Sequence, residues 1–355
     1  MSMTIDRYEI DMLDVKNADA FLVHFFTDQG FEYVVLIDGG NYKDGETITQ
    51  FIKDNYKQQY IDLAICTHCD KDHFGGIMYL LEQMRDRVKD HIYINKIWIH
   101  DPAEHVEYGM IKWSTDKQKV DVKARSVYDL NGGNLWDVLD ELIKQNRIKW
   151  REPFSNPQSK NQESDWLGCF SVVGPTVEYY TSLVPEFRND LKRKKGGYEF
   201  EEPEDINIHE ADEMLNKRMD EAEDDPSSHN KSSVMVLFKP GMYKKYLFTG
   251  DASRESFDKL RGTALYNSLS NLTWLKIPHH GSIHNMDSTL VQHLCPGTAY
   301  VSTEKYNHYL SRSVVAAFQK VGTDIYTTNV HGSVCHMCNT TLHKGYSYAD
   351  PLQHE

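Results

Sequence analysis

The sequence predicts an α/β fold built in packed layers, and three observations lead to this class. Apolar runs typical of strands alternate with segments of helical periodicity along the chain. The chain has 355 residues, of which 40% are hydrophobic and 26% charged, so it can bury a sizeable core. Both halves run in a similar order, strands and then helices, which suits a sandwich of two sheets.

The first half of the chain opens with strand patterns that run into helices. Strands are expected at residues 8–15, 20–26, 33–37, 61–66 and 96–100. Helices are expected at residues 46–56 and 76–89, and the apolar residues of the second helix fall on one face.

The second half is less regular before it returns to the same order. Strands are expected at residues 170–174, 233–238, 245–249, 273–277, 298–302 and 324–328, with helices at 135–145 and 311–321. We expect a single domain spanning residues 1–355, with insertions at about 101–165 and 185–228. Residues 199–225 are strongly acidic. They are expected to form a solvated surface, or alternatively a lid or a surface that binds a protein partner.

Composition and charge exclude several classes of protein. The net charge of −14 argues against non-specific coating of nucleic acid, although bound cations can still attract a phosphodiester locally. The first residues lack the apolar stretch of a signal peptide, and no apolar run reaches the length of a membrane helix. Six cysteines in such a chain do not indicate a disulfide framework. We therefore expect a cytoplasmic protein with no membrane partner, and the oligomeric state stays open.

A cluster of metal-competent side chains follows the strand expected at 61–66. His68, Asp70, Asp72 and His73 fall within six residues, where the end of a strand can aim them into one cleft. Imidazole and carboxylate together suit Zn, Mn or Fe. His68 and Asp70 can serve one ion while Asp72 and His73 serve another.

Two later strands end in the same way. One runs into Gly250-Asp251 and the other into Pro278-His279-His280-Gly281. Asp251 can bridge two cations, and one of the two histidines can complete the shell of the second ion. Ligand-bearing residues at three strand ends are hard to explain by packing alone.

These residues, in this order, resemble the metallo-β-lactamase superfamily. The order is Asp38, then His68-x-Asp70-x-Asp72-His73, Asp251 and His279-His280. Further stretches resemble the ComEC-like branch of that superfamily, at residues 13–15, 19–20, 36–40, 67–76, 232–233, 247–251, 275–282, 306–308 and 328–332. The resemblance implies an αββα sandwich with a dinuclear metal site at one edge.

The chain departs from the common motif of the superfamily at two points. Asp70 stands where most members have a histidine, although the ComEC-like branch shares this aspartate, which makes Mn²⁺ as plausible as Zn²⁺. The histidine that usually precedes the bridging aspartate has no clear equivalent, and His229 or Asn230 could fill that place. Occupancy of the first metal site and the choice between His279 and His280 are left open.

The resemblance implies roles for the candidate residues. The metal ligands would be His68, Asp70, Asp72, His73, Asp251, His279 and His280. A hydroxide between two divalent cations would attack the substrate, with Asp72, His73 and Asp251 at the centre of catalysis. Asp38 would orient a ligand. Lys276, Ser282 and His308 are candidates for contacts with the substrate or the leaving group, although Lys276 could instead point to solvent.

Three functions remain for comparison. The leading one is a metal-dependent phosphodiesterase or nuclease acting on nucleic acid or a nucleotide. The second is a hydrolase of a carbon-centred ester, lactone or β-lactam, and the third is a non-catalytic scaffold in a defence or DNA-processing system. Outside this site, Cys335-x-x-Cys338 near His331 could form a zinc knuckle, but no partner pair follows, so two ordinary cysteines on a terminal strand are the simpler interpretation.

Overall fold

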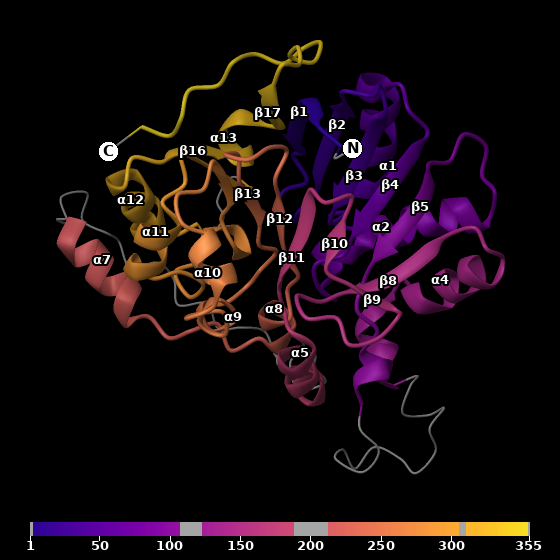
Figure 1. Ribbon diagram of the computed structural model, residues 1–355, viewed down its shortest axis with the longest axis horizontal. Coiled ribbons are helices and arrows are strands. Elements are labelled where there is room, and N and C mark those ends of the chain that lie inside the picture. Colours follow the sequence, from indigo (N-terminus) through magenta and orange to yellow (C-terminus); the bar gives the residue numbers. More distant parts are fainter. Residues whose placement is uncertain (1–2, 107–122, 188–211, 305–309, 354–355) are drawn as a thin grey trace.

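The computed structural model describes residues 3–106, 123–187, 212–304 and 310–353, and it contains two large mixed sheets that pack face to face (Figure 1). The first sheet has eight strands in the order β17 (Val334–Cys338), β1 (Ile5–Met12), β2 (Phe21–Thr27), β3 (Glu32–Ile37), β4 (Tyr60–Ile65), β5 (Tyr93–Trp98), β8 (Lys149–Pro153) and β9 (Gln162–Glu163). The second has seven, in the order β10 (Asp165–Trp166), β11 (Phe170–Gly174), β12 (Met235–Phe238), β13 (Tyr246–Phe248), β14 (Trp274–Lys276), β15 (Thr298–Val301) and β16 (Asp324–Thr327).

Helices cover the outer face of each sheet. The first sheet carries α1 (Asp44–Phe51), which continues as a π-helix over Ile52–Tyr56, together with α2 (Lys71–Arg85), α4 (Leu135–Lys144) and α5 (Val177–Leu183). The second sheet carries α9 (Arg254–Asp258), α10 (Ala264–Ser268), α11 (Ser288–Leu294) and α12 (Arg312–Lys320), and α7 (Asp212–Glu221) packs on α12. Shorter elements are the β6–β7 hairpin (Asp129–Leu130, Gly133–Asn134), α8 (Ser228–Lys231) and α13 (Thr328–His331).

Three buried layers follow from the alternation of side chains along the strands. In β2, Leu22 faces the helices of the first sheet, whereas Phe21 faces the second sheet. The Phe21 ring lies 5.8 Å from the ring of Phe248 and 6.0 Å from that of Trp274, which joins the two sheets. The order of layers is therefore helices, sheet, sheet, helices, and it confirms the αββα fold expected from the sequence.

The largest difference from the expected elements lies at the metal-competent motif. A helix was expected from residue 76, but α2 begins at Lys71, directly after Asp70 in an extended conformation with φ −86° and ψ 146°. Gly75 and Gly76 disfavour a helix in isolation and conceal this first turn from a periodicity argument. As a result, Asp72 and His73 project from a rigid helical turn rather than from a loop.

Within the region expected as the first insertion, α4, β8 and β9 extend the first sheet and its helical layer. Much of the second expected insertion lies outside the described residues, and its described part contains α7. The buried side chain of Met219 on α7 packs into the core of the second sheet.

Candidate metal centre

The candidate ligands gather where parallel strands of both sheets end. In the first sheet, β3 and β4 run parallel, and their ends deliver Asp38 and the segment that carries His68 and Asp70. In the second, β13 and β14 run parallel, and they deliver Asp251 and the pair His279-His280. The carboxyl ends of parallel strands meet at one edge of a sheet, so the two edges together form the site.

Strained backbone marks these strand ends. Asp38, His279 and His280 have φ angles of 57°, 46° and 53°, in the left-handed region that non-glycine residues rarely adopt. Such conformations persist only where surrounding packing enforces them, and they concentrate at functional sites. Here they turn two consecutive histidines so that both Nε2 atoms face carboxylates of the site.

Two glycines, Gly39 and Gly76, allow the N-terminal part of α2 to touch the end of β3. A Cβ on Gly76 would lie 1.9 Å from the carbonyl oxygen of Gly39, and a Cβ on Gly39 would lie 2.5 Å from the backbone nitrogen of Ile77. The backbone N–H of Gly39 donates to the carbonyl of His73 over 2.7 Å. This contact fixes His73 relative to Asp38 and explains the Gly-Gly pairs in both motifs.

One ligand atom each of His68, His73 and Asp251 lies within 4.8 Å of the other two, and the distances to Asp70 and Asp72 divide the ligands into two groups that share Asp251. In one group, Nε2 of His68 lies 3.7 Å from Oδ2 of Asp70 and 3.9 Å from Oδ2 of Asp251. In the other, Nε2 of His73 lies 3.3 Å from the same Oδ2 of Asp251 and 3.9 Å from Oδ2 of Asp72.

His280 joins the second group, because its Nε2 lies 3.8 Å from Oδ2 of Asp72. The Nε2 of His279 lies instead beside Asp251, 4.0 Å from its Oδ2. The structure thus brings together all seven residues that the sequence predicted as metal ligands, and it separates the places of the two histidines.

The chemistry of the donor set fits divalent cations. Nε2 of His68 and Nε2 of His73 are buried and have no hydrogen-bond partner among the residues that the structure describes. Buried polar atoms are almost always paired, so two unpaired ring nitrogens facing carboxylates need an explanation. Imidazole nitrogens and carboxylate oxygens at these separations are suitable ligands for zinc or manganese.

Neighbouring groups fix the orientation of two ligand histidines. Nδ1 of His73 lies 2.9 Å from Oδ2 of Asp38, whose carboxylate also accepts from the backbone N–H of Thr67 over 2.8 Å. Nδ1 of His280 lies 2.9 Å from the carbonyl oxygen of Ser302. Both partner oxygens accept, so each Nδ1 is the donor, and each Nε2 is the nitrogen that would bind a cation in place of a proton.

Lys276 is buried rather than exposed to solvent, with 1% of its surface accessible. Its Nζ forms an ion pair with Asp19, lies 3.3 Å from Oδ1 of Asp251 and donates to the carbonyl of Gly250 over 2.6 Å. Lys276 therefore contacts Oδ1 of Asp251, whereas His68 and His73 face Oδ2 of the same carboxylate. Asp19, which also accepts from the hydroxyl of Ser302, was not among the predicted site residues, although it lies in a stretch that resembles the ComEC-like branch.

His279 is held by the last residue of the acidic run. Its Nδ1 lies 3.1 Å from Oδ2 of Asp225 and 3.0 Å from Oδ1 of Asn285. Asp225 is buried, unlike the solvated surface expected for residues 199–225, and the side-chain amides of Asn230 and Asn285 also donate to it. No sequence signal distinguishes Asp225 from the acidic residues before it.

His229 lies next to Asp70 rather than among the shared ligands. Its Nδ1 is 2.8 Å from Oδ1 of Asp70, and its Nε2 is 3.0 Å from the carbonyl oxygen of Phe187. Burial lowers the pKa of His229, but Cys69 and Asp70 outweigh this effect and raise it to about 10. As placed, the ring orients the carboxylate of Asp70.

The site concentrates charge that a cation would stabilise. Burial alone would lower the pKa of His73, but Asp251 and Asp38 raise it well above its usual range. Burial raises the pKa of Asp251, whereas His73 and Lys276 bring it well below its usual range. Asp251 therefore stays ionised in the interior, as a metal ligand must.

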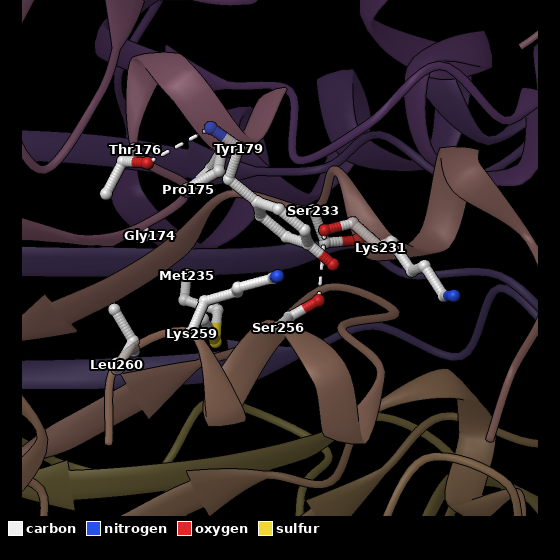
Figure 2. A pocket seen from close by; sticks show the side chains of 10 residues that line it. All are labelled: Gly174, Pro175, Thr176, Tyr179, Lys231, Ser233, Met235, Ser256, Lys259 and Leu260. Carbon is white, nitrogen blue, oxygen red and sulfur yellow. Dashed lines mark hydrogen bonds between the residues drawn. The ribbon is translucent and has the colours of Figure 1, made fainter. Parts of the chain in front are cut away.

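The site opens to solvent on the side of Asp72, whose side chain is 36% exposed, and of His279, whose side chain is 20% exposed. Ser282 is buried, and its hydroxyl accepts from the backbone N–H of His284. His308 lies outside the described residues. A separate crevice of about 10 Å³ beside Tyr179 and Lys231 reaches Ser233 behind the site, and it holds at most about one water (Figure 2).

The four layers and the ligand-bearing strand ends are those that the resemblance to the metallo-β-lactamase superfamily led us to expect. No family model matches the chain. Its sequence is 28% identical over 114 residues to ComE operon protein 3 of Bacillus subtilis (strain 168), a match that spans 31% of this chain and 14% of that protein. This match agrees with the resemblance to the ComEC-like branch.

A structure of a long form RNase Z from yeast matches 92% of this chain and 41% of its own, with 12% identity. The TM-score of this match is 0.38. The chain thus spans less than half the length of either protein. Within the described residues, we find no helix that combines the length and the apolar character needed to cross a bilayer.

Proposed function

We propose that the chain is a hydrolase that uses two divalent cations, Zn²⁺ or Mn²⁺, to cleave phosphodiester bonds in a nucleic acid or a nucleotide. One observation carries this proposal. Oδ2 of Asp251 lies 3.9 Å from Nε2 of His68 and 3.3 Å from Nε2 of His73, so a single carboxylate faces both halves of the site. A carboxylate in this position is suited to bridge two ions.

In this proposal, His68, Asp70 and Asp251 would hold the first cation, and Asp72, His73, His280 and Asp251 would hold the second. Asp70 supplies oxygen where most members of the superfamily supply nitrogen, which gives the first site a harder character. Catalysis by two cations would supply an activated water and neutralise charge on the oxygens of a phosphodiester.

Charge favours a phosphodiester over a neutral ester. Asp70, Asp72 and Asp251 bring three negative charges and an activated hydroxide a fourth, and two divalent cations would offset all four, so the loaded site would no longer repel an anion. The chain as a whole carries −14 and repels a polyanion. We infer that the attraction is local to the metal centre, and that the substrate contacts the protein over few phosphates.

The residues around the ligands have separate tasks in this proposal. Asp38 and the carbonyl of Ser302 keep the protons on Nδ1 of His73 and His280. Lys276 acts as a positioning residue, because it is buried against Asp251 and cannot reach a substrate. His279, which faces the open side, is placed to contact the substrate or to complete the first metal site. We assign the hydroxyl of Ser282 no contact with the substrate, because it is buried and accepts a hydrogen bond from the backbone N–H of His284.

A panel of metal-restored reactions tests the function. Metal-stripped protein is given single- and double-stranded DNA and RNA, cyclic dinucleotides and a chromogenic phosphodiester, each with Mn²⁺, Zn²⁺ or Mg²⁺. We expect cleavage that depends on metal and is lost in Asp72→Ala, whereas Asp137→Ala, on α4 away from the site, cleaves normally. Protein that binds metal but cleaves no phosphodiester would refute the proposal and favour an ester or lactone hydrolase, or a scaffold.

We also propose a cytoplasmic location. All six cysteines are free, including Cys335 and Cys338, which both lie on β17. Free thiols in this number are typical of a reducing compartment.

A further inference from the structure

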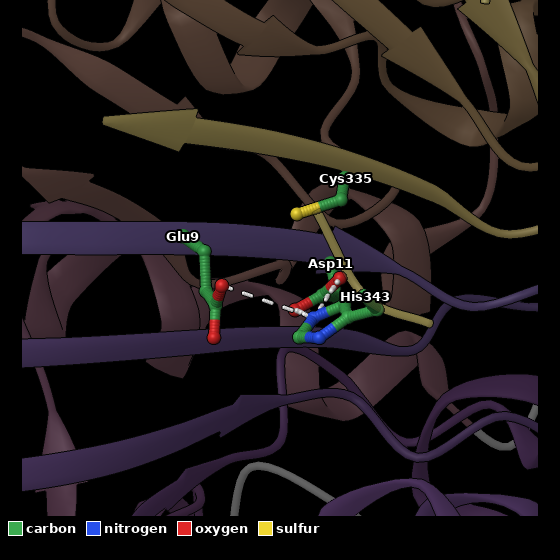
Figure 3. A group of neighbouring side chains, drawn as sticks. All are labelled: Glu9, Asp11, Cys335 and His343. Atoms are coloured by element: carbon green, nitrogen blue, oxygen red, sulfur yellow. Dashed lines mark hydrogen bonds and ion pairs between the residues drawn. The ribbon is translucent and has the colours of Figure 1, made fainter. Parts of the chain in front are cut away.

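We propose a second metal site, structural rather than catalytic, in which Glu9, Asp11, Cys335 and His343 hold a zinc-type cation (Figure 3). The site lies where the C-terminal segment returns to the first strand of the first sheet. It shares no residue with the candidate metal centre, and it does not depend on the proposed function.

The topology of the first sheet places these four side chains together. Glu9 and Asp11 are alternate residues of β1, so they share one face of the strand. β17 pairs with β1 in antiparallel register, and Cys335 lies directly opposite Asp11. His343 follows β17 on the segment that turns back over this face. One ligand atom from each residue lies within 4.8 Å of all the others.

The distances are those of ligands around one small ion. Nε2 of His343 lies 3.2 Å from Oδ1 of Asp11 and 3.8 Å from Oε2 of Glu9. A tetrahedral zinc with bonds of about 2.0–2.3 Å separates its ligand atoms by about 3.3–3.7 Å. The two printed separations therefore lie close to those of ligands on a single zinc ion.

Neighbouring side chains hold the carboxylates so that one oxygen of each stays available. Tyr56 donates its hydroxyl to Oδ2 of Asp11, and Nδ1 of His24 lies 2.7 Å from Oε1 of Glu9. The remaining oxygens, Oδ1 of Asp11 and Oε2 of Glu9, face His343. Such outer contacts commonly orient the ligands of metal sites.

Burial makes the need for a cation clear. Asp11 is 0% exposed and Glu9 is 5% exposed. Oδ1 of Asp11 accepts no hydrogen bond from the residues described in the structure, and its cationic neighbour is His343. Two adjacent buried carboxylates are costly unless charge compensates them.

The ligand set differs from the zinc knuckle considered for Cys335, Cys338 and His331. Successive residues of a strand alternate between its faces, so Cys338 points away from Cys335 and packs against the core between the sheets. His331 bonds to the carbonyl of Asp350 through Nε2. Cys335 also lines a cavity of about 830 Å³ beside this segment.

Cobalt substitution tests the site in the full chain. Metal-stripped protein is loaded with Co²⁺, and the thiolate-to-cobalt charge-transfer absorption is recorded. We expect this band in the wild type, its loss in Cys335→Ser, and its retention in Cys338→Ser. Cys69→Ser must also retain the band, because Cys69 is the cysteine beside the candidate metal centre. A wild type without the band, or a band that survives in Cys335→Ser, would overturn the proposal.

Two further measurements test the site if the cysteine variants fail to fold. One is the zinc content of histidine variants, and the other is alkylation of the wild type. Zinc content should fall by about one ion per chain in His343→Ala and stay unchanged in His331→Ala. In the unmodified chain, zinc should protect Cys335 from alkylation, and a chelator should restore its reactivity, while Cys295 reacts equally in both states. Equal reactivity of Cys335 with and without zinc would contradict the site.

Discussion

Replacement of Gly76 by alanine is the sharpest test of how the fold positions the site. The new Cβ would lie 1.9 Å from the carbonyl oxygen of Gly39, where contacts below 3.0 Å are essentially never seen. The first turn of α2 and the end of β3 must therefore move apart by roughly 1 Å or more, which is overpacking against rigid backbone.

The expected loss of stability follows from opposing contributions. Overpacking costs about 1–3 kcal/mol. Two backbone hydrogen bonds at the same contact, Gly39 to His73 at 2.7 Å and Gly76 to Gly40 at 3.1 Å, would weaken, at about 0.5–1.5 kcal/mol each. Alanine is favoured over glycine inside a helix by about 1 kcal/mol. The clash outweighs this gain, and we expect a net destabilisation of about 1–5 kcal/mol.

Denaturant unfolding and metal content measure the effect, with Gly241→Ala as the control because a Cβ at Gly241 meets no atom within 4 Å. We expect Gly76→Ala to unfold at lower denaturant and to bind metal more weakly, because His73 moves relative to Asp38. A variant as stable as wild type, with its metal content intact, would refute the reasoning. Helix propensity would then dominate at this position.

Three further predictions concern the site and the core. Asp38→Asn should weaken the affinity for the second cation by about 10–100-fold, measured by competition with a chelator, and an unchanged affinity would show that Asp38 does not orient His73. Lys276→Met should destabilise the metal-free protein by about 3–5 kcal/mol, because Asp19 and Asp251 are left buried without their cation; an unchanged unfolding midpoint would contradict this role. Burial lowers the pKa of His100 to about 3, so its stabilising effect is complete above about pH 6.5 and is lost as the pH falls towards 3. His100→Phe should reduce the acid slope of unfolding free energy over that range by up to about 1.4 kcal/mol per pH unit, and an identical slope would count against a buried neutral imidazole.

Strand ends and ligand types could be predicted from the sequence because both are local properties. Asp72, His73 and Asp251 stand beside apolar strands and glycines, and the structure brings them within reach of one another. The start of α2 was predicted five residues late, because tertiary contact with Gly39 compensates for two unfavourable glycines.

Contacts between distant segments could not be predicted from the sequence. Asp225 looks like any other residue of an acidic run, and only the fold places it against His279. The sequence alone does not distinguish the adjacent residues His279 and His280. Their left-handed backbone angles determine which carboxylate each one faces. The proposed site of Glu9, Asp11, Cys335 and His343 depends on strand register and on a segment that follows β17.

Anomalous diffraction from crystals of the metal-loaded protein tests the central claim most directly. Data collected at the absorption edges of zinc and manganese would place each cation relative to Asp251. We predict two peaks on either side of its carboxylate, each about 2.0–2.2 Å from a ligand oxygen or nitrogen, with His68 on one ion and His73 on the other. A single peak bound by His68 and His73 together, or none beside Asp251, would contradict a dinuclear centre.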